Sequence, residues 1–198
     1  MNTLFLIDDH PMLRRGLASY LSETGKYRVV GEASTLEEAF RALERIKSAP
    51  KLIILDIELG KESGFKLFDY LNRKKAQPKV LVFSIFNDPF RIQSAIHLGA
   101  QGYVSKAALE DELVRAIDTV LNGEIYLDPS LEKLIDKKND VYTLFTRRER
   151  DILTLIKRHY GNQQIAKELS LSLRTVENYL TRIYDKTGVK YRNDLLAL

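Results

Sequence analysis

The sequence contains no cysteine, and this absence removes several kinds of chemistry at once. Without thiols there is no disulfide, no thiolate nucleophile and no cysteine-ligated metal. Long hydrophobic runs are also missing: the apolar stretches fall far short of the roughly 18 residues that a membrane span needs. The first residues, up to Leu6, carry none of the positive side chains that open a signal peptide. We therefore expect a soluble, cytoplasmic protein with no membrane partner.

The composition is that of an ordinary globular chain of 198 residues. Hydrophobic residues make up 44% and charged residues 29%, which excludes a wholly disordered, collagen-like or coiled-coil protein. Positive charge is unevenly spread along the chain. Residues 1–123 hold 17 basic and 16 acidic side chains, a net of +1, whereas residues 144–198 hold 11 and 6, a net of +5. The basic C-terminal part favours a polyanionic partner.

Residues 1–121 alternate between short apolar runs and stretches with helical spacing of their hydrophobic residues. Continuous apolar runs are typical of strands that are buried on both faces of a parallel sheet. The alternation therefore predicts a five-stranded, doubly wound α/β domain. The five runs lie near residues 4–7, 28–33, 52–55, 80–83 and 102–104.

A second domain follows, after a segment rich in polar residues and turn formers. Residues 122–143 predict a linker that contains one helical turn around Ser130–Ile135. From residue 144 to residue 198 the pattern is wholly helical. A capping box at Thr146–Glu149 opens the first helix, and Ser172 is placed to cap a longer one. A short helix, a tight connection and a longer helix in a basic module indicate a helix-turn-helix.

Side chains that carry chemistry follow four of the five predicted strands. Each alone is typical of a solvated loop, but parallel strands end at one edge of a sheet, where binding sites form. Clustered carboxylates repel each other unless a hard divalent cation such as Mg²⁺ intervenes. An aspartate can also attack phosphorus, while a hydroxyl and an ammonium group hold the phosphoryl oxygens. The side chains are Asp8, Asp9, Asp56, Ser84, Ser105 and Lys106.

This set resembles the receiver domain of two-component response regulators, over nearly all of residues 1–121. The resemblance implies a flavodoxin-like fold, Mg²⁺ as cofactor and a sensor histidine kinase as the phosphoryl donor. The implied sites are Asp56 as phospho-acceptor; Asp8, Asp9, Asp56 and the backbone carbonyl of Glu58 for the metal; and Ser84, Tyr103 and Lys106 for phosphoryl binding and switching.

Residues 144–198 resemble the LuxR-type helix-turn-helix of the NarL/FixJ response regulators, through Thr146–Glu149, Asn162, Ile165-Ala166 and Thr175-Val176. The resemblance implies a transcription regulator that dimerises when phosphorylated and binds double-stranded promoter DNA. We expect base contacts from the recognition helix, near residues 172–186, because such helices enter the major groove. The candidates for base edges are Arg174, Glu177, Asn178 and Thr181. The candidates for phosphates are Arg174, Thr175, Arg182, Lys186 and Lys190.

Three other functions fit the sequence less well. A phosphatase with an aspartate nucleophile resembles an Asp-x-Asp pattern after its first strand, whereas Asp8 and Asp9 are adjacent, so we expect no turnover on an external substrate. A phosphate-independent DNA-binding regulator with an inactive receiver gains support only from Ile85, where relatives usually have a small residue. A purely structural protein leaves the acidic residues and the predicted recognition helix unexplained.

Ile85 generates a testable prediction. Its β-branched side chain is expected to narrow access to Asp56 and so to slow both gain and loss of a phosphoryl group. Ile85→Ala should therefore shorten the phosphoryl lifetime, measured by intact mass after a small phosphodonor is removed. An unchanged lifetime in this variant contradicts the hypothesis.

Overall fold

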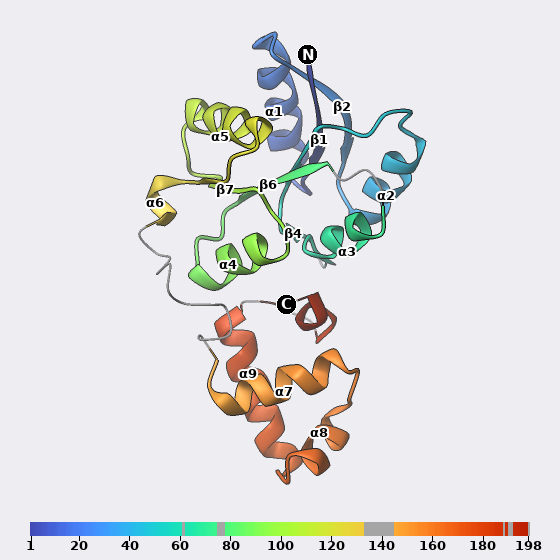
Figure 1. Ribbon diagram of the computed structural model, residues 1–198, viewed down its shortest axis with the longest axis vertical. Coiled ribbons are helices and arrows are strands. Elements are labelled where there is room, and N and C mark those ends of the chain that lie inside the picture. The colour runs from blue at the N-terminus through green and yellow to red at the C-terminus, as the bar shows by residue number, and fades with distance from the viewer. Residues whose placement is uncertain (61, 75–77, 133–144, 188, 190–191, 198) are drawn as a thin grey trace.

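The computed structural model describes residues 1–60, 62–74, 78–132, 145–187, 189 and 192–197. It has an α/β part up to residue 132 and a helical part from residue 145 (Figure 1). Among the described helices, none combines the length and the apolar character needed to cross a lipid bilayer.

Six parallel strands form one sheet in the order β2-β1-β3-β6-β7-β8. Side chains of successive residues point to opposite faces of a strand, so β1 supplies Leu4 and Leu6 to one core and Phe5 and Ile7 to the other. This two-sided burial explains why the strands are continuously apolar. The strands are β1 Asn2–Ile7, β2 Tyr27–Ala33, β3 Leu52–Leu55, β6 Lys79–Ser84, β7 Gly102–Ser105 and β8 Tyr126–Leu127.

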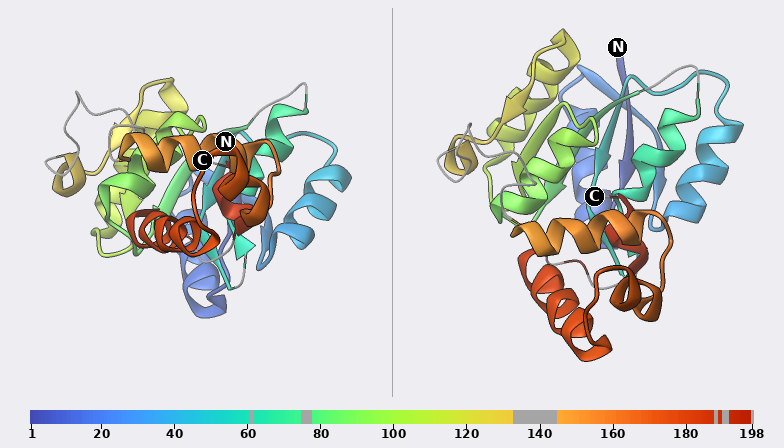
Figure 2. Two further views of the ribbon diagram at one scale, coloured as in Figure 1. Left: turned by 90° about the horizontal axis from the view of Figure 1, so that it is seen from below. Right: turned by 60° about the horizontal axis from the view of Figure 1, so that its bottom comes forward.

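Helices cover both faces of the sheet (Figures 1 and 2). Helices α1 (Pro11–Glu23) and α5 (Glu110–Asn122) pack on the core that contains Leu4 and Leu6. The opposite core lies under three helices, and a two-stranded antiparallel hairpin follows β3. These elements are α2 Leu36–Arg45, α3 Lys66–Asn72, α4 Pro89–His97, β4 Glu58–Leu59 and β5 Glu62–Ser63.

The prediction of five strands is wrong by one. Strand β8 lies inside the segment predicted to be a linker, and it pairs in parallel with β7. Gly102 lets it approach, because a Cβ there would lie 2.7 Å from Leu81 Cδ1 and 3.1 Å from the carbonyl oxygen of Tyr126. A strand of two residues is too short to show any hydrophobic period, so the sequence pattern missed it. Helix α6 (Pro129–Glu132) follows at once.

The helical part packs four short elements around a separate core. The predicted capping box is confirmed: the Thr146 N–H donates to the Glu149 carboxylate at 2.7 Å, and the Glu149 N–H donates to Thr146 Oγ1 at 3.3 Å. Ser172 Oγ accepts from the Thr175 N–H at 3.0 Å, as expected of a helix cap. The elements are α7 Arg147–Lys157, α8 Asn162–Glu168, α9 Leu173–Thr187 and the 3₁₀ helix η2 Arg192–Ala197.

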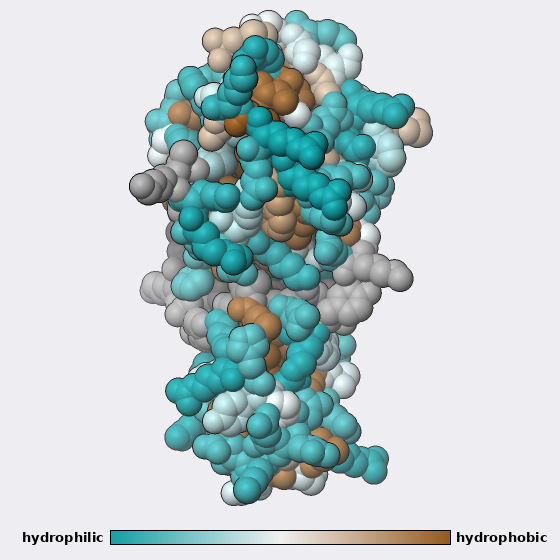
Figure 3. All heavy atoms as spheres, turned by 90° about the vertical axis from the view of Figure 1, so that its right-hand side faces the viewer, coloured by the Kyte–Doolittle hydropathy of each residue, from teal (hydrophilic) through white to brown (hydrophobic). Residues whose placement is uncertain are grey.

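The helical part contacts the α/β part on the side of α3 and α4. Helix α4 contacts α9, and α3 contacts η2 (Figures 1 and 2). The face in Figure 3 is mostly hydrophilic with small apolar spots, as expected when helices turn their apolar sides inward.

Candidate functional site

Asp8, Asp56 and Lys106 meet at the carboxyl edge of the sheet, as predicted. They follow β1, β3 and β7, and their side chains are nearly fully buried. Lys106 Nζ lies 2.7 Å from Asp8 Oδ2 and 2.6 Å from Asp56 Oδ2. One ammonium group therefore lies between two buried carboxylates and offsets part of their mutual repulsion.

Burial raises the pKa of Asp56, while the hydrogen bond and the positive charge of Lys106 oppose this shift without cancelling it. Asp56 Oδ1 also accepts the N–H of Glu58 at 3.2 Å, and this bond favours the ionised carboxylate. Burial alone would lower the pKa of Lys106, but the two carboxylates raise it above its usual value. Both carboxylates therefore favour the charged form of Lys106 beside Asp56.

Gly64 closes the loop behind Asp56. Its N–H donates to the carbonyl oxygen of Ile57 at 2.8 Å. A Cβ at this position would lie 2.4 Å from the carbonyl oxygen of Asp56, closer than any side chain can approach. Only glycine therefore lets the loop pack against the backbone that carries Asp56.

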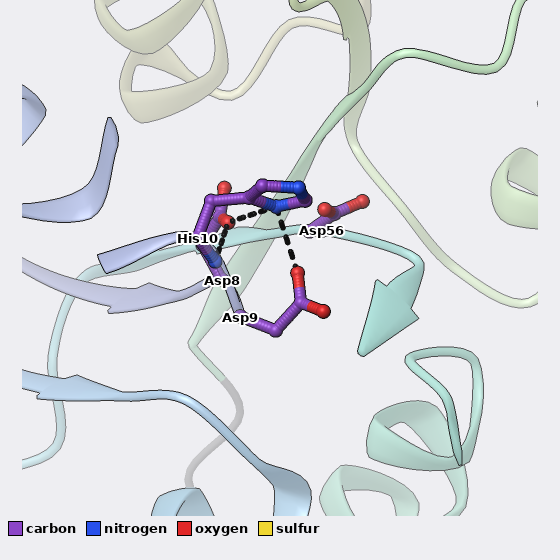
Figure 4. A group of neighbouring side chains, drawn as sticks. All are labelled: Asp8, Asp9, His10 and Asp56. Carbon is purple, nitrogen blue, oxygen red and sulfur yellow. Dashed lines mark hydrogen bonds and ion pairs between the residues drawn. The ribbon is translucent and has the colours of Figure 1, made fainter. Parts of the chain in front are cut away.

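Asp9 and His10 complete an acidic cluster with Asp8 and Asp56 (Figure 4). One ligand atom from each of the four residues lies within 4.8 Å of all the others. His10 Nδ1 is 2.8 Å from Asp9 Oδ1 and 3.2 Å from Asp8 Oδ1. Nothing in the sequence separates His10 from an ordinary surface histidine except its place directly after two aspartates.

The donor set of this cluster fits a divalent cation. Asp9 Oδ2 accepts the N–H of Gly60 at 2.9 Å, whereas His10 Nδ1 is the neighbour of the buried Asp9 Oδ1. Three carboxylates gathered in this way are typical of a site for a hard cation. The Glu58 N–H lies beside the cluster, and the Glu58 carbonyl as a ligand stays a prediction.

Ser84 and Tyr103 are both fully buried, and the backbone of Phe86 connects them. The Tyr103 hydroxyl donates to the carbonyl oxygen of Phe86 at 2.6 Å, and the Phe86 N–H lies 3.3 Å from Ser84 Oγ. Burial raises the pKa of the Tyr103 hydroxyl, which therefore stays a donor. Ile85, which stands between Ser84 and Phe86 in the sequence, is 61% exposed.

Helix α9 has one buried and one exposed face. Val176, Leu180 and Ile183 are buried in the helical core. Most of the predicted DNA-contacting side chains lie on the other face: Arg174, Glu177, Asn178, Thr181, Arg182 and Lys186 are exposed, and Thr175 is half-buried. The predicted contact Lys190 lies outside the described residues.

Lys186 also has a partner inside the protein. Its ammonium group lies 2.6 Å from Glu149 Oε2, and Glu149 is 2% exposed. Burial raises the pKa of Glu149, but the hydrogen bonds from Lys186 and Thr146 lower it by more, so the net shift is downward. Lys186 thus ties the end of α9 to the start of α7.

Known proteins resemble both parts of the chain. Residues 4–118 match the family described as response regulator receiver domain, and residues 143–198 match bacterial regulatory proteins of the luxR family. The nitrate/nitrite response regulator protein NarL of Escherichia coli (strain K12) is 33% identical, over 96% of this chain and 91% of its own. The oxygen regulatory protein NreC of Staphylococcus aureus (strain JH9) is 30% identical, over 98% and 94%.

Solved structures share the fold over nearly the whole length. RcsB from Salmonella enterica serovar Typhimurium, bound to promoter P1flhDC, aligns with a TM-score of 0.68 at 22% identity, over 98% of this chain and 96% of its own. The response regulator ChrA of a heme-sensing two-component system aligns with a TM-score of 0.53 at 28% identity, over 98% and 94%. A receiver followed by a LuxR-type DNA-binding domain defines a two-component response regulator. The chain belongs to the NarL/FixJ family of these regulators and is a phosphorylation-controlled, DNA-binding regulator of transcription.

The pair of Lys186 and Glu149 makes a prediction for stability. Lys186→Met leaves a buried carboxylate without its cation, so the free energy of unfolding at pH 7 should fall by about 1–3 kcal/mol. The native pKa of Glu149 lies below the unfolded value of about 4.3. The contribution of the pair is therefore present above that pH and is lost as the pH falls through the native pKa. Urea denaturation at pH 7 and below pH 4 measures both effects.

The matched control is Lys167→Met, which removes an exposed lysine from α8. It should leave stability nearly unchanged at both pH values. An equal loss in the two variants would contradict a specific role for the Lys186 ion pair.

Proposed function

We propose that Asp56 accepts a phosphoryl group from a sensor histidine kinase and that the modified protein binds promoter DNA through α9. The observation that supports this most strongly is Lys106, whose ammonium lies 2.6 Å from Asp56 and 2.7 Å from Asp8. A buried carboxylate beside a fixed cation and a cation-binding cluster suits phosphoryl transfer, which depends on positioning and charge neutralisation.

In the proposed transfer, an oxygen of Asp56 forms a bond to phosphorus while the phosphorus–nitrogen bond of the donor phosphohistidine breaks. The electron pair of that bond returns to the departing imidazole. Lys106 is close enough to contact an oxygen of the new phosphoryl group, and Ser84 supplies a hydroxyl donor from the neighbouring strand β6. Asp8, Asp9, Asp56 and the Glu58 carbonyl would hold Mg²⁺, which supplies positive charge to the phosphoryl oxygens.

The buried link from Ser84 to Tyr103 gives this transfer a route to the rest of the domain. A hydrogen bond from Ser84 to a phosphoryl oxygen would change its contact with the Phe86 N–H, and Tyr103 donates to the same residue. Such a packed link has discrete arrangements rather than a continuous range, and new charge at Asp56 would favour one of them.

A test of the acceptor uses intact mass with a small phosphodonor. The wild type should gain one phosphoryl group in Mg²⁺, and chelation of the metal or Asp56→Asn should abolish the gain. The exposed Asp111→Asn on α5 is the control and should behave as wild type. No gain by the wild type under any condition would favour the phosphate-independent alternative. Small phosphoesters tested alongside should show no turnover, because the proposed transfer ends on Asp56 of the protein itself.

For DNA, we propose that the exposed face of α9 enters the major groove. Base contacts are proposed for the exposed residues Arg174, Glu177, Asn178 and Thr181, since asparagine pairs with adenine and glutamate accepts from cytosine. Phosphate contacts are proposed for Arg174, Thr175, Arg182, Lys186 and Lys190. Structures of RcsB contain dimers bound to DNA. We extend this to a homodimer on half-sites about one helical turn apart.

Two substitutions separate base contacts from phosphate contacts. Asn178→Ala should cost about 1–3 kcal/mol on the preferred site and relax the preference at one base pair. Arg182→Ala should weaken binding uniformly and reduce the salt slope by about 1. Titration at several salt concentrations, on a selected site and on mismatched sites, measures both. Arg148→Ala, an exposed arginine on α7, is the control, and an equal effect there would argue against this face.

A further inference from the structure

Asp128 lies where the sheet ends and the linker begins, directly after β8, and it is only 5% exposed. Its N–H donates to the carbonyl oxygen of Tyr103 at 3.0 Å. Its own carbonyl oxygen accepts from Leu131 at 2.8 Å and from Glu132 at 3.0 Å, in α6. The backbone of this one residue therefore joins the strand that carries Tyr103 to the linker helix.

The two carboxylate oxygens of Asp128 have separate partners. Oδ1 accepts the N–H of Ser130 at 2.9 Å and its hydroxyl at 2.6 Å, and these bonds cap α6. Oδ2 accepts the N–H of Ser105, the last residue of β7, at 3.3 Å. A serine in this place would suffice to cap the helix, so the cap alone does not require aspartate. The second oxygen is what reaches the end of β7.

The end of β7 is also where the acceptor site is anchored. The residue after Ser105 is Lys106, whose ammonium bonds to Asp56 and whose N–H donates to the carbonyl oxygen of Ser84 at 2.8 Å. Ser105 Oγ accepts from Asn87 Nδ2 at 3.3 Å. A shift of Lys106 toward a phosphoryl group therefore acts on the backbone that Asp128 contacts.

The rest of the attachment is short but packed. Strand β8 has two residues, and its register with β7 spans two pairs. Tyr126 of β8 and Leu131 of α6 are buried in the cores of the α/β part, so Asp128 adds a polar link to an apolar one. No cation within the described chain pairs with the buried Asp128 carboxylate, so its three hydrogen bonds must offset the cost of burying the charge. A buried charge held in this way at a domain exit indicates a specific requirement for both of its partners.

We infer that Asp128 is a positioning residue that couples the state of the Asp56 site to α6, the last described element before the DNA-binding domain. This inference rests on the proposed phosphorylation of Asp56. When Lys106 and the end of β7 move, the bond from Ser105 to Oδ2 changes, and α6 follows because Oδ1 holds it on the same carboxylate.

Two variants of the full chain separate coupling from helix capping. Asp128→Ser keeps a capping hydroxyl for α6 but is too short to reach Ser105 as well. Asp128→Asn has one acceptor oxygen, so it can serve Ser130 or Ser105 but not both, and it is the second variant if the first folds poorly. Ser130→Ala is the matched control, because it removes one hydrogen bond to Oδ1 and leaves the bond between Ser105 and Oδ2 intact.

Each protein is treated with a small phosphodonor in Mg²⁺ and followed by intact mass, by hydrogen exchange at Leu131 and Glu132, and by DNA affinity. In the wild type and Ser130→Ala, phosphorylation should change exchange in α6 and shift DNA affinity by a factor in the range of about 5 to 150. Asp128→Ser and Asp128→Asn should gain the phosphoryl group normally. Phosphorylation should nevertheless leave their DNA affinity and the hydrogen exchange of α6 unchanged.

If both Asp128 variants gain the phosphoryl group normally and phosphorylation changes their DNA affinity as much as in the wild type, the coupling role is overturned and the proposed function stands. A wild type that gains no phosphoryl group would overturn both. If phosphorylation no longer changes DNA affinity in Ser130→Ala either, the effect depends on the helix cap and not on the link to Ser105, and the coupling role is overturned.

Discussion

The ammonium group of Lys106 holds the receiver site together. It lies between two carboxylates that end different strands, and all three side chains are buried. Without it, Asp8 and Asp56 would place two like charges close together in a region of low dielectric, where they repel each other strongly. The ends of β1, β3 and β7 are therefore fixed relative to each other by charge as well as by the sheet. The cation site lies at the ends of β1 and β3, and the attachment of the linker lies at the end of β7.

The sequence predicts this site because a simple geometric rule connects it to the fold. Parallel strands end at one edge, so polar residues after separate apolar runs must meet there, and Asp8, Asp56 and Lys106 do meet. The capping box at Thr146 involves only residues that are close in the sequence, so the sequence predicts it as well. The roles of individual side chains in metal binding, phosphoryl transfer and DNA recognition are not decided by that rule, and they stay predictions.

The features that the sequence hides are short or depend on packing between distant segments. Strand β8 is two residues long, below the length at which a period can be recognised. The bond from Lys186 to Glu149 spans 37 positions, and its existence depends on how α9 crosses α7. Asp128 is a polar residue in a polar segment, so the sequence does not distinguish it from any other linker residue. Only the register of β8 against β7 shows that its carboxylate reaches Ser105.

Strand β8 also has a consequence for self-association. It is the last strand of the sheet, so it covers the side of β7 that would otherwise be an open edge. An uncovered edge presents unpaired N–H and C=O groups that a strand from another chain can join. A linker that left the sheet completely would therefore expose a template for pairing between molecules. With β8 in place, the outermost strand on this side has two residues and offers far fewer unpaired groups to another chain than β7 would.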